Sequence, residues 1–248
     1  TLGAAGATVA HREGAWSDYR GYPGVINFSE SRMILCGNDE WPQGIWGSKS
    51  GNYENMTPGV LDADAFSYKL AANQNYIRLM ETTKGILIGT LGGEYRMKGG
   101  TDDPISPTNI NINSETDNGS AEIAPIRVKN TTLFVQKAGR KIIELVYSWE
   151  SEGFKDTDLT ILAEHLTIAG IKKIVYQQEP NSMIWGYDGN GNLIGITFNR
   201  KENVIGFHHH STDGIIEDIS VIPSSVFMED ELWAIIKRTI AGVEMRFI

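Results

Sequence analysis

The sequence predicts an all-β, propeller-like fold of about five antiparallel blades, and three observations support this. Short apolar segments bounded by turn residues recur, with centres 53, 47, 50 and 49 residues apart at Ile34, Leu87, Phe134, Ile184 and Trp233. A repeat of about 50 residues is typical of propellers. Glycine supplies 27 of 248 residues, or about 11% against a usual ~7%, which suits a fold with many tight turns. Each apolar centre also lies between two further strand-like segments. Radially arranged, four-stranded blades are the simplest account of this pattern.

The elements repeat in the same order in each unit. A first strand is predicted at residues 24–28, 76–80, 125–128, 173–177 and 215–222. The apolar centre follows, and then a third strand at 44–47, 93–97, 141–147, 193–198 and 243–247. Outer strands are visible at 65–70, 109–114 and 204–208. The clearest hairpin joins 184–187 to 193–196 through the Asp/Gly/Asn turn 188–192, whose residues tolerate positive φ.

Residues 1–248 are predicted to form a single β-propeller domain. Residues 1–20, with a strand-like stretch at 7–10, are expected to supply a ring-closing strand. Residues 156–169 are expected to form an inserted amphipathic helix, because Leu159, Leu162 and Leu166 are spaced as on one helix face and Gly170 ends the segment. The loops 99–107 and 115–120 are expected to be mobile excursions.

Composition restricts the function. The net charge of −9 argues against tight binding of nucleic acid, which needs Lys and Arg to displace counterions. Cys36 is the single cysteine, so an intrachain disulfide and a cysteine-based zinc site are excluded, and we expect a buried strand residue. No apolar run is long enough for a transmembrane helix, and no signal peptide is visible. Membrane insertion is therefore not expected.

The residues that could carry chemistry give weak signals. Of His208, His209 and His210, only the first and last could share one face of a strand and a metal ion, and a polar strand end is the favoured interpretation. The turn 188–192 resembles the start of a calcium loop but lacks its glycine and final Glu, so a hairpin turn is favoured. We therefore predict no catalytic, cofactor-binding or metal-binding residues, and no cofactor.

Acidic and aromatic residues are left with default roles. Acidic pairs such as Asp102–Asp103 and Glu229–Asp230 are expected to lie in solvated loops, although a carboxylate pair at the hub stays open. The six tryptophans are expected to serve core and inter-blade packing, with a sugar platform as the alternative.

An ordered set of seven segments resembles one protein family. The segments are YRGYPGV (19–25), SRMILCG (31–37), PQGIWGSKSGNY (42–53), ILIGTLGGE (86–94), LFVQKAGRK (133–141), DLTILAEH (158–165) and YQQEP (176–180). Their order and spacing resemble the tail nozzle proteins of short-tailed bacteriophages and prophages, which are described as tail tubular protein B or packaged-DNA stabilisation proteins. The resemblance covers roughly residues 19–248, and members of the family are usually longer. The chain is therefore expected to be the propeller core of a longer tail protein.

The resemblance implies a structural protein of the virion and not an enzyme. It implies a homo-oligomeric ring, commonly a hexamer, that contacts adaptor and fibre proteins and is made in the host bacterial cytoplasm. Its channel would retain double-stranded DNA and conduct it during ejection, with the loops 99–107 and 115–120 as candidate constrictions. The acidic chain would let DNA slide without sticking. Two alternatives stay open: a propeller enzyme that degrades glycans through a converging carboxylate pair, and a monomeric interaction propeller.

Overall fold

The computed structural model describes residues 14–71, 75–100, 103–150, 153–226 and 228–248. Within these ranges the chain forms five antiparallel sheets in sequence order. The first contains β1 (Val25–Ser29), β2 (Arg32–Cys36), β3 (Gly44–Gly47) and β4 (Phe66–Lys69). The second contains β5 (Ile77–Thr83), β6 (Gly85–Thr90), β7 (Glu94–Lys98) and β8 (Asn111–Thr116). The third contains β9 (Ile126–Val128), β10 (Thr131–Val135), β11 (Ile142–Ser148) and β12 (Gly153–Asp158). The fourth contains β13 (Ile171–Gln177), β14 (Met183–Asp188), β15 (Leu193–Asn199) and β16 (Val204–His210), and the fifth contains β17 (Ile215–Pro223), β18 (Asp230–Ile240) and β19 (Val243–Phe247).

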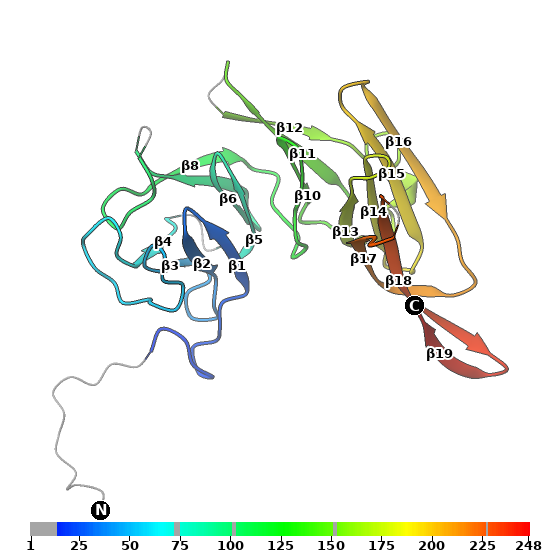
Figure 1. The fold of residues 1–248 in the computed structure, drawn as a ribbon, viewed down its shortest axis with the longest axis horizontal. Helices are drawn as coiled ribbons and strands as arrows, with labels where there is room; N and C mark the ends of the chain where they lie inside the picture. The colour runs from blue at the N-terminus through cyan, green and yellow to red at the C-terminus, as the bar shows by residue number, and fades with distance from the viewer. Residues whose placement is uncertain (1–13, 72–74, 101–102, 151–152, 227) are drawn as a thin grey trace, which may run out of the picture.

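The sheets follow one another along an arc, with the first and the fifth at opposite ends (Figure 1). In every sheet the strands are hydrogen-bonded in chain order, so each sheet is an antiparallel meander. The first strands of neighbouring sheets contact one another, as β1 does β5, β9 does β13 and β13 does β17. These strands therefore form the inner edge of the arc. The predicted apolar centres lie in β2, β6, β10, β14 and β18, the second strand of each sheet. The predicted all-β, propeller-like fold is confirmed.

The core consists of apolar clusters between neighbouring sheets. One cluster, which includes Ile34, Ile45 and Ile88, lies between the first and second sheets. A smaller cluster built around Leu87 and Phe134 joins the second and third sheets. A third cluster fills the space between the third and fourth sheets (Leu133, Val135, Ile174, Ile184, Ile196). This burial between faces is the main stabilising contribution, because it removes apolar area from water. The apolar clusters therefore determine how the hairpin tips of neighbouring sheets are placed relative to one another.

Equivalent loops of repeated units lie on the same side of such a fold. We call the side that carries the β1–β2, β5–β6 and β9–β10 turns the hairpin face. Residues of these turns, Glu30, Lys84 and Asn130, line adjoining cavities, as described below. The hairpin face therefore gathers loops that are distant in sequence.

The predicted helix at residues 156–169 is wrong in its extent. Residues up to Asp158 belong to β12, and the helical part is a single 3-10 turn at Glu164–Leu166. The Asp158 carboxylate accepts hydrogen bonds from the backbone N–H of Thr160 at 2.9 Å and from its hydroxyl at 2.5 Å, which favours a turn here. Leu162 is 91% exposed, so the apolar spacing does not form a buried helix face.

Other expectations have mixed outcomes. Cys36 is fully buried in β2, as predicted, and burial raises the pKa of its thiol. Most of the proposed ring-closing segment, including residues 7–10, lies outside the described residues. Along the described ranges, no helix has the length and apolar character needed to cross a membrane.

The predicted mobile loops are anchored to the fold. Ile105 is 2% exposed within the loop 99–107, whereas Thr101 and Asp102 lie outside the described residues. In the segment 115–120, the first two residues belong to β8, and Ser120 is fully buried with its backbone N–H donated to Thr90 O at 2.7 Å.

Glu94 gives the fold a testable pH dependence. Its buried carboxylate accepts hydrogen bonds from Ser120 Oγ at 2.6 Å and Thr116 Oγ1 at 2.5 Å, but burial outweighs them and raises the pKa of Glu94 above its usual 4.5. Between pH 4.5 and the raised pKa, the native state keeps a proton on Glu94 that the unfolded state has lost. The contribution of Glu94 to the free energy of unfolding is therefore complete below about pH 4.5 and is lost as the pH rises through the raised pKa.

We expect Glu94→Gln to reduce the fall in unfolding free energy between pH 4 and pH 7, as measured by urea denaturation. The exposed Glu122→Gln variant is the control and should keep the wild-type slope. An unchanged slope in Glu94→Gln would contradict this assignment.

Candidate functional site

The most polar large cavity lies on the hairpin face, where the first three sheets meet. It has a volume of about 780 Å³ and adjoins a second cavity of about 320 Å³, with which it shares Lys84, Tyr147 and Trp149. We call the two together the hairpin cleft. Its main polar and aromatic lining residues are Glu30, Lys84, Arg96, Lys98, Asp103, Asn113, Tyr147 and Trp149. They come from three different sheets and from the loop after β7.

Two aromatic residues at the end of β11 form one wall of the hairpin cleft. The rings of Tyr147 and Trp149 meet edge to face, with centroids 5.4 Å apart. The Lys84 ammonium lies 3.3 Å from the centroid of the Trp149 ring, which is a cation–π contact. Trp149 is nevertheless 72% exposed. An indole held in place and largely open to solvent is suited to stacking against a ligand ring.

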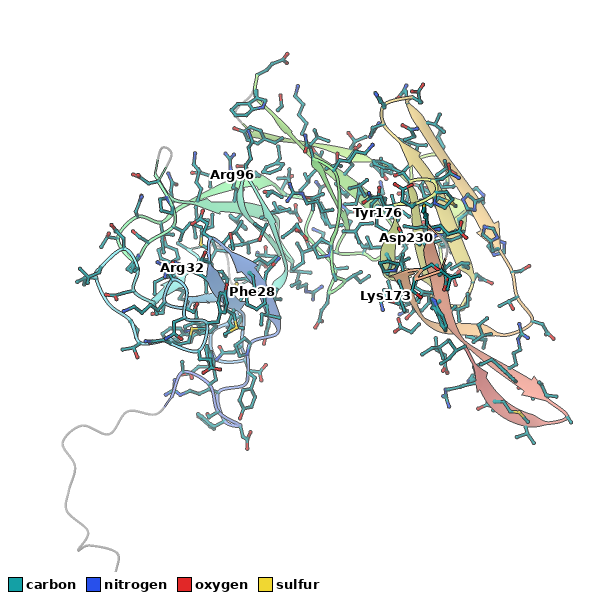
Figure 2. All side chains as sticks on the ribbon, viewed as in Figure 1. Phe28, Arg32, Arg96, Lys173, Tyr176 and Asp230 are labelled. Carbon is teal, nitrogen blue, oxygen red and sulfur yellow. The ribbon has the colours of Figure 1, made fainter. Side chains whose placement is uncertain are left out.

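A buried ion pair supports this wall from below. The Arg96 side chain extends from β7 in the second sheet (Figure 2), and its Nε lies 2.7 Å from Glu115 Oε1, with both side chains 7% exposed or less. The guanidinium also lies 5.2 Å from the Tyr147 ring and 5.7 Å from the Phe154 ring. Glu115 Oε2 accepts the backbone N–H of Phe154 at 3.1 Å. The pair therefore joins the second sheet to the aromatic wall of the third.

Two carboxylates line the same cavity. Glu30 lies at the β1–β2 turn, and its Oε2 accepts the backbone N–H of Ile105 at 2.7 Å, which ties this turn to the loop after β7. Asp103 comes from that loop. Both residues are exposed, so both carboxylates are accessible to a ligand in the cleft.

Two glycines fix the positions of these groups. Gly85 follows Lys84 with a φ of +95°, and a Cβ there would lie 2.7 Å from the Met97 carbonyl oxygen of β7. At Gly99, a Cβ would lie 2.1 Å from the Asp103 carbonyl oxygen. Glycine at both positions lets the turn that carries Lys84 and the loop that carries Asp103 pack closely against backbone.

The motifs singled out from the sequence lie elsewhere. His208 Nδ1 lies 2.7 Å from His210 Nε2 beside the Trp185 ring, and burial lowers the pKa of His208. Asp188 uses its carboxylate to accept the backbone N–H groups of Asn190 and Asn192, both at 2.9 Å, so the segment 188–192 is a hairpin turn as favoured. Over the described ranges, no group of three or more His, Cys, Asp or Glu side chains is placed to hold a metal ion.

The acidic pairs separate into different roles. Asp230 Oδ2 accepts the backbone N–H groups of Gln178 at 2.8 Å and Glu179 at 3.0 Å, which joins the fourth sheet to the fifth. Figure 2 shows Asp230 in this region together with Tyr176 and Lys173. Asp230 therefore stabilises the contact between sheets, whereas Asp103 faces the hairpin cleft.

Sequence reasoning missed the site. Trp149 was expected to serve packing, with a sugar platform as the alternative, and Glu30, Lys84, Arg96 and Lys98 were not singled out. The available signal was the position of Trp149 at the end of a strand and before a polar hairpin tip, where a packing tryptophan is not expected.

Comparisons with known proteins support the fold. No protein-family model and no curated protein matches the chain. Among solved structures, a putative 6-phosphogluconolactonase from Bacteroides uniformis has a TM-score of 0.57 and 13% identity over 90% of this chain and 69% of its own. A Lactobacillus plantarum protein has a TM-score of 0.48 and 11% identity over 90% of this chain and 80% of its own. A luciferin-regenerating enzyme has a TM-score of 0.42 and 11% identity over 77% of this chain and 62% of its own.

These comparisons correct the interpretation as a phage tail nozzle. The solved structure with a TM-score above 0.5 is named as a putative 6-phosphogluconolactonase and not as a tail protein, and no family model matches the chain, so the structural virion role and the expectation of a non-enzyme are withdrawn. The expectation that residues 99–107 and 115–120 constrict DNA depended on that role and is withdrawn with it. The ring stoichiometry, the tail partners and the location in a virion had no other support.

Proposed function

We propose that the protein is a propeller enzyme that degrades a glycan in the hairpin cleft. The observation that carries the proposal is the convergence of an exposed indole, Trp149, with two accessible carboxylates, Glu30 and Asp103, on one cavity. A sugar-binding cleft needs a flat apolar surface for the faces of the pyranose rings and polar groups for their hydroxyls. The likeness in fold to a structure named as a 6-phosphogluconolactonase agrees with a role as an enzyme.

The two carboxyl groups supply the chemistry that glycosidic cleavage requires. In such reactions one carboxylic acid protonates the oxygen of the leaving group. The other carboxylate acts on the opposite side of the bond, either by activating a water molecule or by attacking the sugar carbon. Glu30 and Asp103 are the carboxylates that line the cavity. Trp149 and Tyr147 hold the sugar beside them, and Asn113 offers an amide to the hydroxyl groups.

Two separate tryptophan substitutions, one in the cleft and one outside it, test this site. We expect Trp149→Ala to weaken glycan binding by about thirtyfold, or about 2 kcal/mol, the usual effect of truncating an aromatic residue at the centre of a binding site. Binding is measured by isothermal titration against oligosaccharides of several backbones. Trp233→Ala is the matched control, because Trp233 is 46% exposed on the fifth sheet and away from the cleft.

The control should bind as the wild type does. Equal affinities for wild type and Trp149→Ala, or an equal loss in Trp233→Ala, would contradict a glycan site at the hairpin cleft.

A further inference from the structure

The hairpin cleft continues along the hairpin face into a third cavity. This cavity, of about 290 Å³, lies between the third and fourth sheets and shares Asn130 with the cavity of about 320 Å³. Lys129 and Asn130 form the β9–β10 turn, which separates the two spaces. The three cavities follow one another along the hairpin face, across the tips of four sheets, and each shares lining residues with the next. We call the whole the hairpin groove.

The hairpin groove is basic although the chain is acidic. Lys84 and Lys98 line its first part, and Lys129 and Lys201 line its far end. Among the described residues, no carboxylate lies within ion-pair distance of any of these four ammonium groups. The net charge of the chain is −9, so the clustering of cations along one groove is not the average character of the surface.

Two of the three arginines that line the groove differ from these lysines. Arg200 donates from Nε to Glu144 Oε1 at 2.7 Å, and Glu144 is 1% exposed. Arg96 is paired with Glu115. Arg96 and Arg200 are held by buried carboxylates, which leaves the four lysines and Arg127 as the cations available to a ligand.

We propose that the hairpin groove binds a linear, negatively charged glycan, a chain of sugars that carry carboxylate groups. This rests on the proposed function and names its substrate class. Sugar rings stack at Trp149, where the two carboxylates act on one linkage, while acidic groups farther along the chain contact Lys129 and Lys201. A polymer suits this layout because the lysines at the far end lie one cavity beyond the aromatic wall. A short sugar at Trp149 would leave them uncontacted.

The experiment compares polygalacturonate oligomers of increasing length with their methyl-esterified, neutral counterparts. For long acidic chains, we expect Lys129→Ala/Lys201→Ala to weaken binding about tenfold, as expected for the loss of two cationic contacts to an anionic ligand. For disaccharides, the double variant should bind as the wild type does. Restoring charge with Lys129→Arg/Lys201→Arg should recover most of the affinity. The control Lys69→Ala/Lys172→Ala removes the same charge from exposed positions outside the groove.

The possible results distinguish a failure of the acidic-polymer proposal from a failure of the proposed glycan site. Equal binding of acidic and neutral chains would overturn the proposal of an acidic polymer, and so would wild-type binding by Lys129→Ala/Lys201→Ala. A loss of binding in Trp149→Ala would still support the glycan site in either case. If duplex DNA binds as tightly as polygalacturonate and through the same lysines, the groove is a nucleic-acid surface and the inference is wrong.

Discussion

Replacing Arg96 with methionine is expected to lower the free energy of unfolding by about 3–5 kcal/mol, because it leaves a buried carboxylate without its partner. Glu115 is 6% exposed and lies 2.7 Å from Arg96 Nε, so its charge has little access to water once the guanidinium is gone. The same substitution removes the cation beneath the Tyr147 and Phe154 rings. Equilibrium denaturation in urea measures the loss.

Two further variants make this result specific. The double variant Arg96→Met/Glu115→Met removes both charges and should recover most of the stability, since a buried pair can often be replaced by apolar residues at little cost. Lys155→Met breaks an ion pair of 3.8 Å whose lysine side chain is 61% exposed, and it should cost less than about 1 kcal/mol. Equal stabilities for Arg96→Met and Lys155→Met would contradict a buried, structural pair.

Glycan turnover is expected to fall by about 10²–10⁴-fold in Glu30→Gln and in Asp103→Asn, the usual effect of removing a general acid or base. Each substitution replaces a carboxylate with an amide of the same shape on an exposed side chain, so the fold and the binding of substrate should be preserved. In Glu30→Gln, the new side-chain amide keeps an oxygen for the backbone N–H of Ile105, the partner of the wild-type carboxylate. The readout is kcat, with binding measured separately.

Glu202→Gln is the matched control for this pair. Glu202 is exposed in the β15–β16 turn and does not line the hairpin cleft, so its variant should retain wild-type turnover. Wild-type turnover in both Glu30→Gln and Asp103→Asn would show that other groups perform the chemistry.

Most of the fold was predictable because each repeat unit has the same local sequence features, an apolar second strand and glycine-rich turns. Ile34, Leu87, Phe134, Ile184 and Trp233 each mark the second strand of a sheet, and glycine-rich turns separate the strands. The strand β12 (Gly153–Asp158) escaped prediction because it is an edge strand with three exposed residues and little apolar alternation. The helix at 156–169 was overestimated because apolar spacing does not reveal that Leu162 faces solvent.

The similarity to nozzle proteins has a structural explanation. The segments 86–94 and 133–141 each cover at least half of the second strand of a sheet and the turn after it, in β6 and β10, and the segment 31–37 covers β2 with one residue on either side. Such strand–turn sequences are shared by propeller repeats in general. They indicated the architecture, which is confirmed, but they carried no specific information about function.

The candidate site was not predictable because its residues meet only through packing between sheets. Glu30, Lys84 and Trp149 lie in three different sheets and are 54 and 65 residues apart along the chain. Their convergence depends on which hairpin tips become neighbours in the arc. No local pattern around any one of them encodes that relation, and the unusual position of Trp149 before a polar hairpin tip does not indicate which other residues it meets.

A glycan-degrading site at the hairpin cleft requires that the purified chain shorten a glycan. Wild-type protein is incubated with polygalacturonate and with neutral polysaccharides, and the sizes of the products are followed by mass spectrometry. We expect shortened chains with wild type and intact chains with Glu30→Gln and Asp103→Asn at equal protein concentration. Intact chains for every polysaccharide with folded wild-type protein would contradict the assignment of the hairpin cleft as a glycan-degrading site.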